Sequence, residues 1–334
     1  MSNRRLDFID LAKCFGIFTM VWCHGMVTQN VDIWVHGFHM PLFFLLSGWC
    51  FSVKRNPRLL PFLKSRVSSL IIPYVFWSVV LYAGWQLFYL VTDPTKTVPL
   101  KTLCYSLFYN NAMVSPYCAV QWFLTCMFFT QLLGWGILKL TKEKPLPTAF
   151  WCVGLGLAGW LMGYLPFRLP LSLDVAFSAT CFLLIGWLLG QIKNQKRLLH
   201  PLMGVVGVGL GSWLIFVNGY VNMRVISFAN PLLFYIAATI FTLGVLSLCR
   251  LVCHQPWCKP LLWIGKNTLA ILMLNQVFMQ TLKLLVPTTN PWVWFVLALT
   301  AILAMVPFIL LCNRLLPFSV GRKKANVTSP YYGK

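Results

Sequence analysis

The sequence is poor in charged residues, and above all in acidic ones. Only 10% of its 334 residues are charged, with 6 Asp and Glu against 27 Lys and Arg, while 59% are hydrophobic. A soluble domain carries about 25% charged residues, so this chain lacks the polar surface that a water-soluble globule requires. The composition therefore excludes a soluble fold and predicts an integral membrane protein.

The sequence also lacks the cysteine and histidine spacings of a zinc site. It contains 12 cysteines but no Cys-x-x-Cys pair, and most of them lie in apolar runs, where a thiol behaves as a small hydrophobic side chain. Cys104 and Cys118 share one polar loop and could form a disulfide if that loop faces an oxidising compartment. We therefore expect no metal site.

Ten apolar segments are present, each close to the roughly 20 residues that a helix needs to cross the hydrocarbon core. The backbone must satisfy its own hydrogen bonds in lipid, so these segments are helices. We predict an all-α polytopic membrane protein of about ten transmembrane helices in contact with lipid. The predicted spans are residues 8–27, 34–53, 69–91, 120–139, 148–165, 174–192, 201–219, 230–250, 261–284 and 291–313.

The cations form short clusters between these segments instead of the basic stripe of a nucleic-acid-binding protein. If the N-terminus is cytoplasmic, 20 Lys and Arg lie on the cytoplasmic side, 4 lie outside and 3 lie within spans. Cytoplasmic loops of membrane proteins carry such an excess. We predict that both termini are cytoplasmic and that nucleic acid is not a partner. The membrane domain covers residues 1–317, and residues 318–334 form a basic, disordered tail.

The first span contains Asp10, Lys13 and His24. Ionisable residues within a span are functional candidates. Asp10 and Lys13 are one turn apart and can pair, while Lys13 and His24 share nearly the same helix face with about 16 Å of rise between them. Asp10 and Lys13 could instead lie at the inner interface and reach water, and His24 could be a hydrogen-bonded packing residue.

Three of the five histidines lie at the outer ends of the first two spans, namely His24, His36 and His39. Histidine is the side chain best suited to proton transfer near neutral pH. No carboxylate or thiolate stands at a fixed spacing that would make a metal site the better interpretation. The pattern favours proton transfer over metal binding.

These residues stand in motifs that resemble the acyltransferase 3 family, most closely its branch of fucose 4-O-acetylase-like and surface-glycan O-acetyltransferases. The central motifs are Asp10-Leu11-Ala12-Lys13, His24 and Phe38-His39-Met40-Pro41-Leu42-Phe43-Phe44. Further matching elements are Arg66 with Leu70-Ile71-Ile72-Pro73-Tyr74 and Trp77, Gln121-Trp122-Phe123-Leu124, Leu169-Pro170 to Asp174 with Phe182 and Gly186, and Ile264-Gly265-Lys266-Asn267-Thr268-Leu269.

The resemblance implies transfer of an acetyl group from acetyl-CoA to a carbohydrate hydroxyl by a multi-pass protein of the bacterial inner membrane. In that scheme His24 or His39 is the base, and Lys13, Arg66 and Lys266 contact CoA. The candidates for sugar binding are His36, Asp174, Trp122 and Tyr74. Asp174 could equally be an N-terminal helix charge, the two aromatic residues could be interface anchors, and Lys266 could be one more cytoplasmic cation.

Two positions depart from the family pattern. Lys13 stands where many members have Arg, and Asn275 stands where related sequences often carry His. Asn cannot act as a base, so a member that has lost catalysis remains an alternative. The main rival is a transporter or flippase of a lipid-linked glycan, which the absence of internal repeats and the gathering of histidines disfavour.

Overall fold

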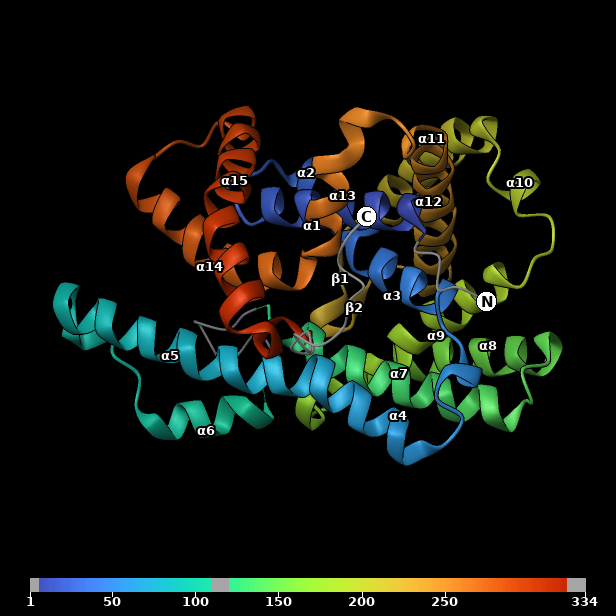
Figure 1. Ribbon diagram of the computed structural model, residues 1–334, viewed down its shortest axis with the longest axis horizontal. Helices are drawn as coiled ribbons and strands as arrows, with labels where there is room; N and C mark the ends of the chain where they lie inside the picture. Colours follow the sequence, from blue (N-terminus) through green and yellow to red (C-terminus); the bar gives the residue numbers. More distant parts are fainter. Residues whose placement is uncertain (1–5, 110–119, 323–334) are drawn as a thin grey trace, which may run out of the picture.

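The computed structural model describes residues 6–109 and 120–322. Within these ranges the chain is almost entirely helical (Figure 1). The helices are α1 (Asp7–Cys23), α2 (Gln29–His36), α3 (His39–Trp49), α4 (Leu59–Arg66), α5 (Ile72–Thr92), α6 (Leu100–Phe108), α7 (Trp122–Leu140), α8 (Pro145–Leu161), α9 (Leu173–Gly190), α10 (Gln195–Leu198), α11 (Pro201–Asn218), α12 (Pro231–Val252), α13 (Lys259–Lys266), α14 (Thr268–Leu285) and α15 (Pro291–Leu315). The short strands β1 (Val221–Asn222) and β2 (Ser227–Phe228) pair antiparallel.

Among the described residues, eight helical stretches are long and apolar enough to cross a membrane. This confirms the prediction of an all-α polytopic membrane protein, and the eight stretches correspond to the last eight predicted spans. The first two predicted spans are built differently. The first is the 17-residue helix α1. The second is divided into α2 and α3, because Phe38 leaves helical geometry, with φ −139° and ψ −28°.

Several spanning helices begin where the sequence supplies a good start signal. Proline fits the first helical position because that position needs no backbone N–H partner. The helices that begin with proline include α8, α11, α12 and α15, at Pro145, Pro201, Pro231 and Pro291. Asn230 and Asn290 precede two of them and accept hydrogen bonds from backbone N–H groups of the first turn.

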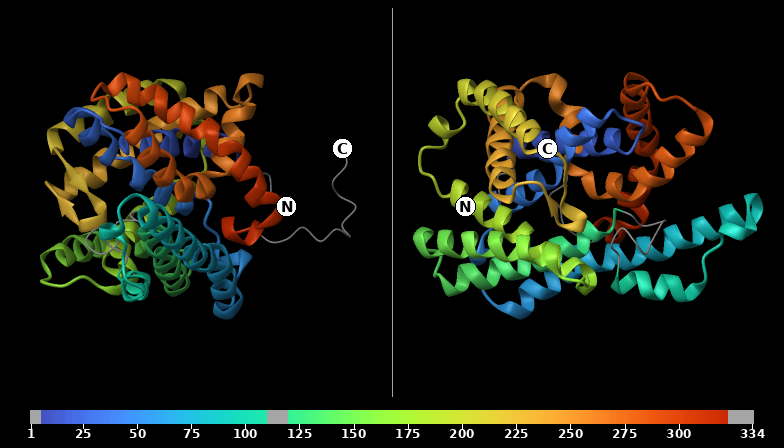
Figure 2. Two further views of the ribbon diagram at one scale, coloured as in Figure 1. Left: turned by 90° about the vertical axis from the view of Figure 1, so that its left-hand side faces the viewer. Right: turned by 180° about the vertical axis from the view of Figure 1, so that it is seen from behind.

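Helix α1 lies at the centre of the structure. It packs against α3, α12, α13, α14 and α15. Helices α4 to α8 form one layer of the molecule, α1 lies among α11 to α15 in the other, and α3 lies between the two layers (Figure 1); the two further views show the same layers (Figure 2). A central position explains how α1 can carry Asp10 in a buried environment, with its side chain only 3% exposed.

Helix α3 is fixed by a close crossing with α9, which also packs against α7 and α8. A Cβ atom added at Gly48 would lie 1.8 Å from the carbonyl oxygen of Leu183, and one added at Gly186 would lie 2.0 Å from that of Leu45. Small residues let the backbones of membrane helices approach closely. The crossing holds α3 in place against the layer that contains α7.

The segment predicted as a tail begins with packed residues. Residues 317–320 form a short 3-10 turn, and the indole nitrogen of Trp77 donates a hydrogen bond to the carbonyl oxygen of Ser319 at 2.8 Å. Residues 318–322 therefore pack with the membrane domain, and residues 323–334 lie outside the described residues. The cytoplasmic location of the two termini stays a prediction.

Candidate active site

A cavity of about 380 Å³ lies between α1, α3, α4, α7 and α14. Its lining combines apolar side chains with a small set of polar ones. The polar residues are Lys13, Ser47, Ser52, Arg55, Asn56, Arg66, Gln131 and Thr268, and the apolar ones include Ile17, Met20, Met40, Phe43, Leu46, Phe123, Leu124, Met127 and Leu272. A largely apolar cavity with a few convergent polar groups is typical of a small-molecule binding site.

Three cations, Lys13, Arg55 and Arg66, give one end of the cavity a positive charge. The ammonium of Lys13 lies 3.3 Å from the carboxylate of Asp10, and its side chain remains 31% exposed. The guanidinium of Arg66 donates a hydrogen bond to Gln131 Oε1 at 2.9 Å and lies over the ring of Phe62. The pairing of Asp10 with Lys13 agrees with the sequence prediction. We call this region the basic end.

The side chain of Gln131 links Arg66 to helix α3. Its amide nitrogen donates to Ser47 Oγ at 3.0 Å while its oxygen accepts from Arg66. Arg66 itself ends α4, directly before a π-helical turn at Val67–Ile71 that leads into α5. The Arg66 side chain is therefore held by Gln131 of α7, which Ser47 of α3 orients in turn, as a preformed anion-binding group requires.

The cavity extends along α1 from the basic end toward two methionines. Lys13, Ile17 and Met20 line it over two turns, about 10 Å of helix. Helix α3 returns beside α1 and contributes residues from Met40 to Ser47, and Cys50, directly after α3, also lines the cavity. Met20 and Met40 define what we call the methionine end. His24 is one turn beyond Met20, and His39 directly precedes Met40, although neither histidine lines the cavity itself.

His24 is held by a residue from the other half of the chain. Its Nδ1 lies 2.6 Å from Oδ1 of Asn275, which is fully buried in α14. The amide nitrogen of Asn275 donates to the carbonyl oxygen of Leu272, so Oδ1 is the atom left to accept from His24. This contact places the proton on Nδ1 and leaves Nε2 free to accept one. Asn275 cannot act as a base itself, but it orients His24 through this hydrogen bond.

His39 has a similar arrangement at the break between α2 and α3. Its Nδ1 lies 2.8 Å from the carbonyl oxygen of Val35, and its side chain is buried. That bond also leaves Nε2 of His39 as an acceptor. The ring of His36 lies edge-on to the ring of His39, with centroids 5.2 Å apart. The structure therefore gives His24 and His39 the same tautomer and brings His36 beside the second of them.

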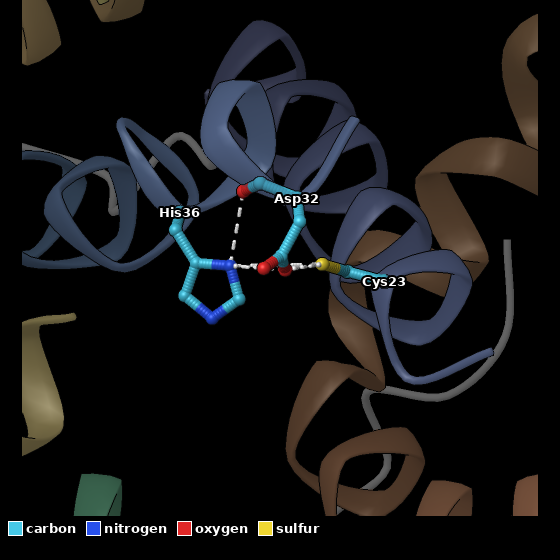
Figure 3. Close-up of side chains that lie close together, drawn as sticks. All are labelled: Cys23, Asp32 and His36. Carbon is cyan, nitrogen blue, oxygen red and sulfur yellow. Dashed lines mark hydrogen bonds and ion pairs between the residues drawn. The ribbon is translucent and has the colours of Figure 1, made fainter. Parts of the chain in front are cut away.

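A further cluster occupies the ends of α1 and α2 (Figure 3). Asp32 Oδ1 accepts from Cys23 Sγ at 3.2 Å and lies 2.9 Å from His36 Nδ1. The hydrogen bond from His36 lowers the pKa of the Asp32 carboxyl, which lies between the first two predicted spans. Sequence reasoning missed Cys23 and Asp32, although the four-residue spacing of Asp32 and His36 on one helix was available as a signal.

Besides Asp10 and the three histidines, four predicted site residues lie outside the cavity lining. The hydroxyl of Tyr74 donates to backbone oxygens of Ser106 and Leu107 on α6. Trp122 is buried in an apolar cluster with residues of α3 and α9. Asp174 is buried and paired with Arg168.

Lys266, the fourth of these residues, ends α13, and its backbone oxygen accepts from Arg322. The cavity lining resumes at Thr268, two residues further along the chain. Arg55 and Gln131 are among the polar cavity residues that sequence reasoning missed. In the sequence Arg55 counts only as one of the loop cations. Gln131 gave no signal because one polar residue in an apolar span has no predictable partner.

The two cysteines of the possible disulfide cannot be compared in space. Cys104 lies in α6 and is exposed, while Cys118 falls outside the described residues. The disulfide therefore stays a prediction.

The fold and the cavity together define a polytopic membrane protein that carries a charged pair and a histidine on one central helix. The acyltransferase domain profile of the acyltransferase 3 family matches residues 6–313. The chain therefore belongs to the acyltransferase 3 family and is a membrane acyltransferase. No curated protein and no solved structure matches it.

Proposed function

We propose that this acyltransferase moves an acetyl group from acetyl-CoA to a hydroxyl of a cell-surface polysaccharide or its lipid-linked sugar precursor, in the inner membrane of a bacterium. One observation carries the proposal. The cavity is basic at one end and apolar along its length, and its methionine end lies within one turn of helix of His24 and next to His39. Such a cavity suits a long donor with an anionic head and a reactive thioester tip.

The donor binds with its phosphates at the basic end. Lys13, Arg55 and Arg66 supply the positive charge, and a guanidinium can bind phosphate through two parallel hydrogen bonds. The pantetheine arm then lies along Ile17, Met20 and the facing residues of α3. The distance from Lys13 to His24 along α1, about 16 Å of helical rise, is comparable to the length of that arm. The thioester thereby reaches the level of the histidines.

The chemistry needs a base for the acceptor hydroxyl. Nε2 of His24 takes the proton as the hydroxyl oxygen bonds to the thioester carbon, and the C–S bond then breaks to release CoA as the thiolate, which receives a proton. Asn275 keeps His24 in the tautomer that this step requires. His39 has the same free Nε2 and is the second candidate for the base.

The acceptor is a carbohydrate on the outer side. The family resemblance, closest to fucose 4-O-acetylase-like proteins, supports a sugar as the substrate class. The charge bias of the loops supports an orientation in which the histidines lie toward the outside of the membrane and the basic end toward the cytoplasm. His36 is the outer-end residue best situated to contact the sugar, because its side chain is 26% exposed and adjoins His39.

The test uses membranes that contain the full chain, radiolabelled acetyl-CoA and a crude extract of cell-surface glycan. We expect label to enter the glycan with wild type and not with His24→Ala. Equal label in both would keep acetyl transfer and move the base to His39. No label with either protein, when both are folded, would contradict acetyl transfer to that glycan and favour a transporter or flippase.

A further inference from the structure

The proposed transfer uses only His36 of the cluster formed by Cys23, Asp32 and His36, as a contact for the sugar, and the donor set of the cluster is unusual. A thiol sulfur, a carboxylate oxygen and an imidazole nitrogen all lie within 4.8 Å of one another (Figure 3). Sulfur, nitrogen and oxygen are the three ligand types that Zn²⁺ takes from proteins. We propose that Cys23, Asp32 and His36 form a binding site for a Zn²⁺ ion.

The distances between the donor atoms fit a tetrahedral ion. Zinc bonds of about 2.3 Å to sulfur and about 2.0 Å to nitrogen or oxygen place tetrahedral ligands about 3.3 to 3.6 Å from one another. The observed separations are 3.2 Å from Cys23 Sγ to Asp32 Oδ1, 3.7 Å from Cys23 Sγ to His36 Nδ1, and 2.9 Å from His36 Nδ1 to Asp32 Oδ1. An ion needs a few tenths of an ångström of opening between Asp32 Oδ1 and each of the other two donor atoms.

The backbone brings these three ligands together, and none of residues 23–36 has a positive φ. Asp32 and His36 are four residues apart on α2 and therefore lie on one face. Cys23 is the last residue of α1, and the short segment of residues 24–28 turns the chain back toward it. The rings of His39 and Tyr220 lie 5.2 and 5.3 Å from the ring of His36 and restrict its orientation.

Access and charge also suit a cation. The side chains of Asp32 and His36 are 35% and 26% exposed, so an ion can enter from the aqueous side. A carboxylate directly beside a thiol disfavours the thiolate, whereas Zn²⁺ between them stabilises both anions. Three protein ligands leave a fourth position open to water, as in zinc sites that are not purely structural.

The first experiment measures binding of Zn²⁺ and Co²⁺ to the purified full chain in detergent. We expect one tight zinc site, and with Co²⁺ a thiolate-to-metal charge-transfer band in the near ultraviolet. Cys23→Ser should abolish that band. Asp32→Asn and His36→Gln should each weaken zinc binding by about tenfold or more, since even groups behind the ligands contribute tenfold.

The control variants are Cys104→Ser and His254→Gln, which change an exposed thiol and an exposed imidazole outside the cluster. Both should bind zinc as wild type does. Thermal unfolding without metal checks that the ligand variants fold, and added zinc should raise the midpoint of wild type but not of Cys23→Ser. Zinc binding that is equal in wild type and in all three ligand variants would overturn the site, whatever the outcome of the acetyl-transfer assay.

Discussion

The two ends of α1 carry different chemistry and are supported by different partners. At one end Lys13 pairs with Asp10 and faces a cavity whose other walls come from α3, α4, α7 and α14. At the opposite end His24 is held by Asn275 of α14, and Cys23 contacts Asp32 of α2. One end gathers positive charge beside an open space, and the other gathers groups that exchange protons or bind metals.

This difference shows how one helix can separate recognition from reaction. Charged groups recognise a ligand well where water can still reach them, because a fully buried charge costs several kcal/mol unless it is paired. A base works best where packing and one fixed hydrogen bond determine its tautomer. The eleven residues from Lys13 to His24 place these two environments about 16 Å apart. If the comparison is correct, changes at the two ends should alter different kinetic constants.

The largest effect is expected at the histidine end. His24→Ala should lower kcat by about 10² to 10⁴, because a positioned base contributes that much, while the KM for acetyl-CoA stays close to wild type. Steady-state transfer of label from acetyl-CoA gives both constants. His39→Ala is the matched variant on α3. If it has the larger effect on kcat, His39 is the base and His24 supports the acceptor.

A smaller effect, on a different constant, is expected at the basic end. Lys13→Ala should raise the KM for acetyl-CoA by about tenfold or more, since a hydrogen bond to a charged group contributes about 1.5–3 kcal/mol, with little change in kcat. Lys13→Arg should keep the affinity, because it retains the charge. The measurement is the KM for acetyl-CoA at saturating acceptor.

Removing Lys13 also leaves the buried carboxylate of Asp10 without that cation, so destabilisation must be separated from lost binding. The double variant Asp10→Asn/Lys13→Ala removes the carboxylate charge as well. It should fold more stably than Lys13→Ala and have the same raised KM. A KM equal to wild type in the double variant would show that Lys13 does not contact the donor.

A variant at Asn275 tests whether the activity of His24 depends on its hydrogen bond to this residue. Asn275→Leu removes the acceptor at similar volume and should lower kcat by about tenfold, the contribution of one well-made hydrogen bond, without changing the KM for acetyl-CoA. In a His24→Ala background the same substitution should have no further effect on kcat, because its action passes through His24. Additive losses would mean that Asn275 acts on packing alone.

The sequence predicted those features that depend on neighbouring residues. The apolar runs predicted the spanning helices, and the spacing of Asp10 and Lys13 predicted their contact. The break at Phe38 was not predicted, although Gly37 directly before it and Pro41 three residues after it are both signals of a helix boundary. The contact between His24 and Asn275 joins residues 251 positions apart, and it depends on how α1 packs against α14.

The smallest effect on the KM for acetyl-CoA is expected for a variant of Lys266. This variant sharpens the comparison of the two ends of α1, because Lys266 carries the same charge as Lys13 but does not line the cavity. The residue ends α13 and does not line the cavity, although Thr268, Leu269 and Leu272 do. A cation outside the donor's reach acts only through a screened field, worth less than about 1 kcal/mol. Lys266→Ala should therefore change the KM for acetyl-CoA by less than about threefold at moderate salt, measured beside Lys13→Ala in the same membranes. An increase as large as that of Lys13→Ala would place Lys266 against the donor and extend the basic end to α13.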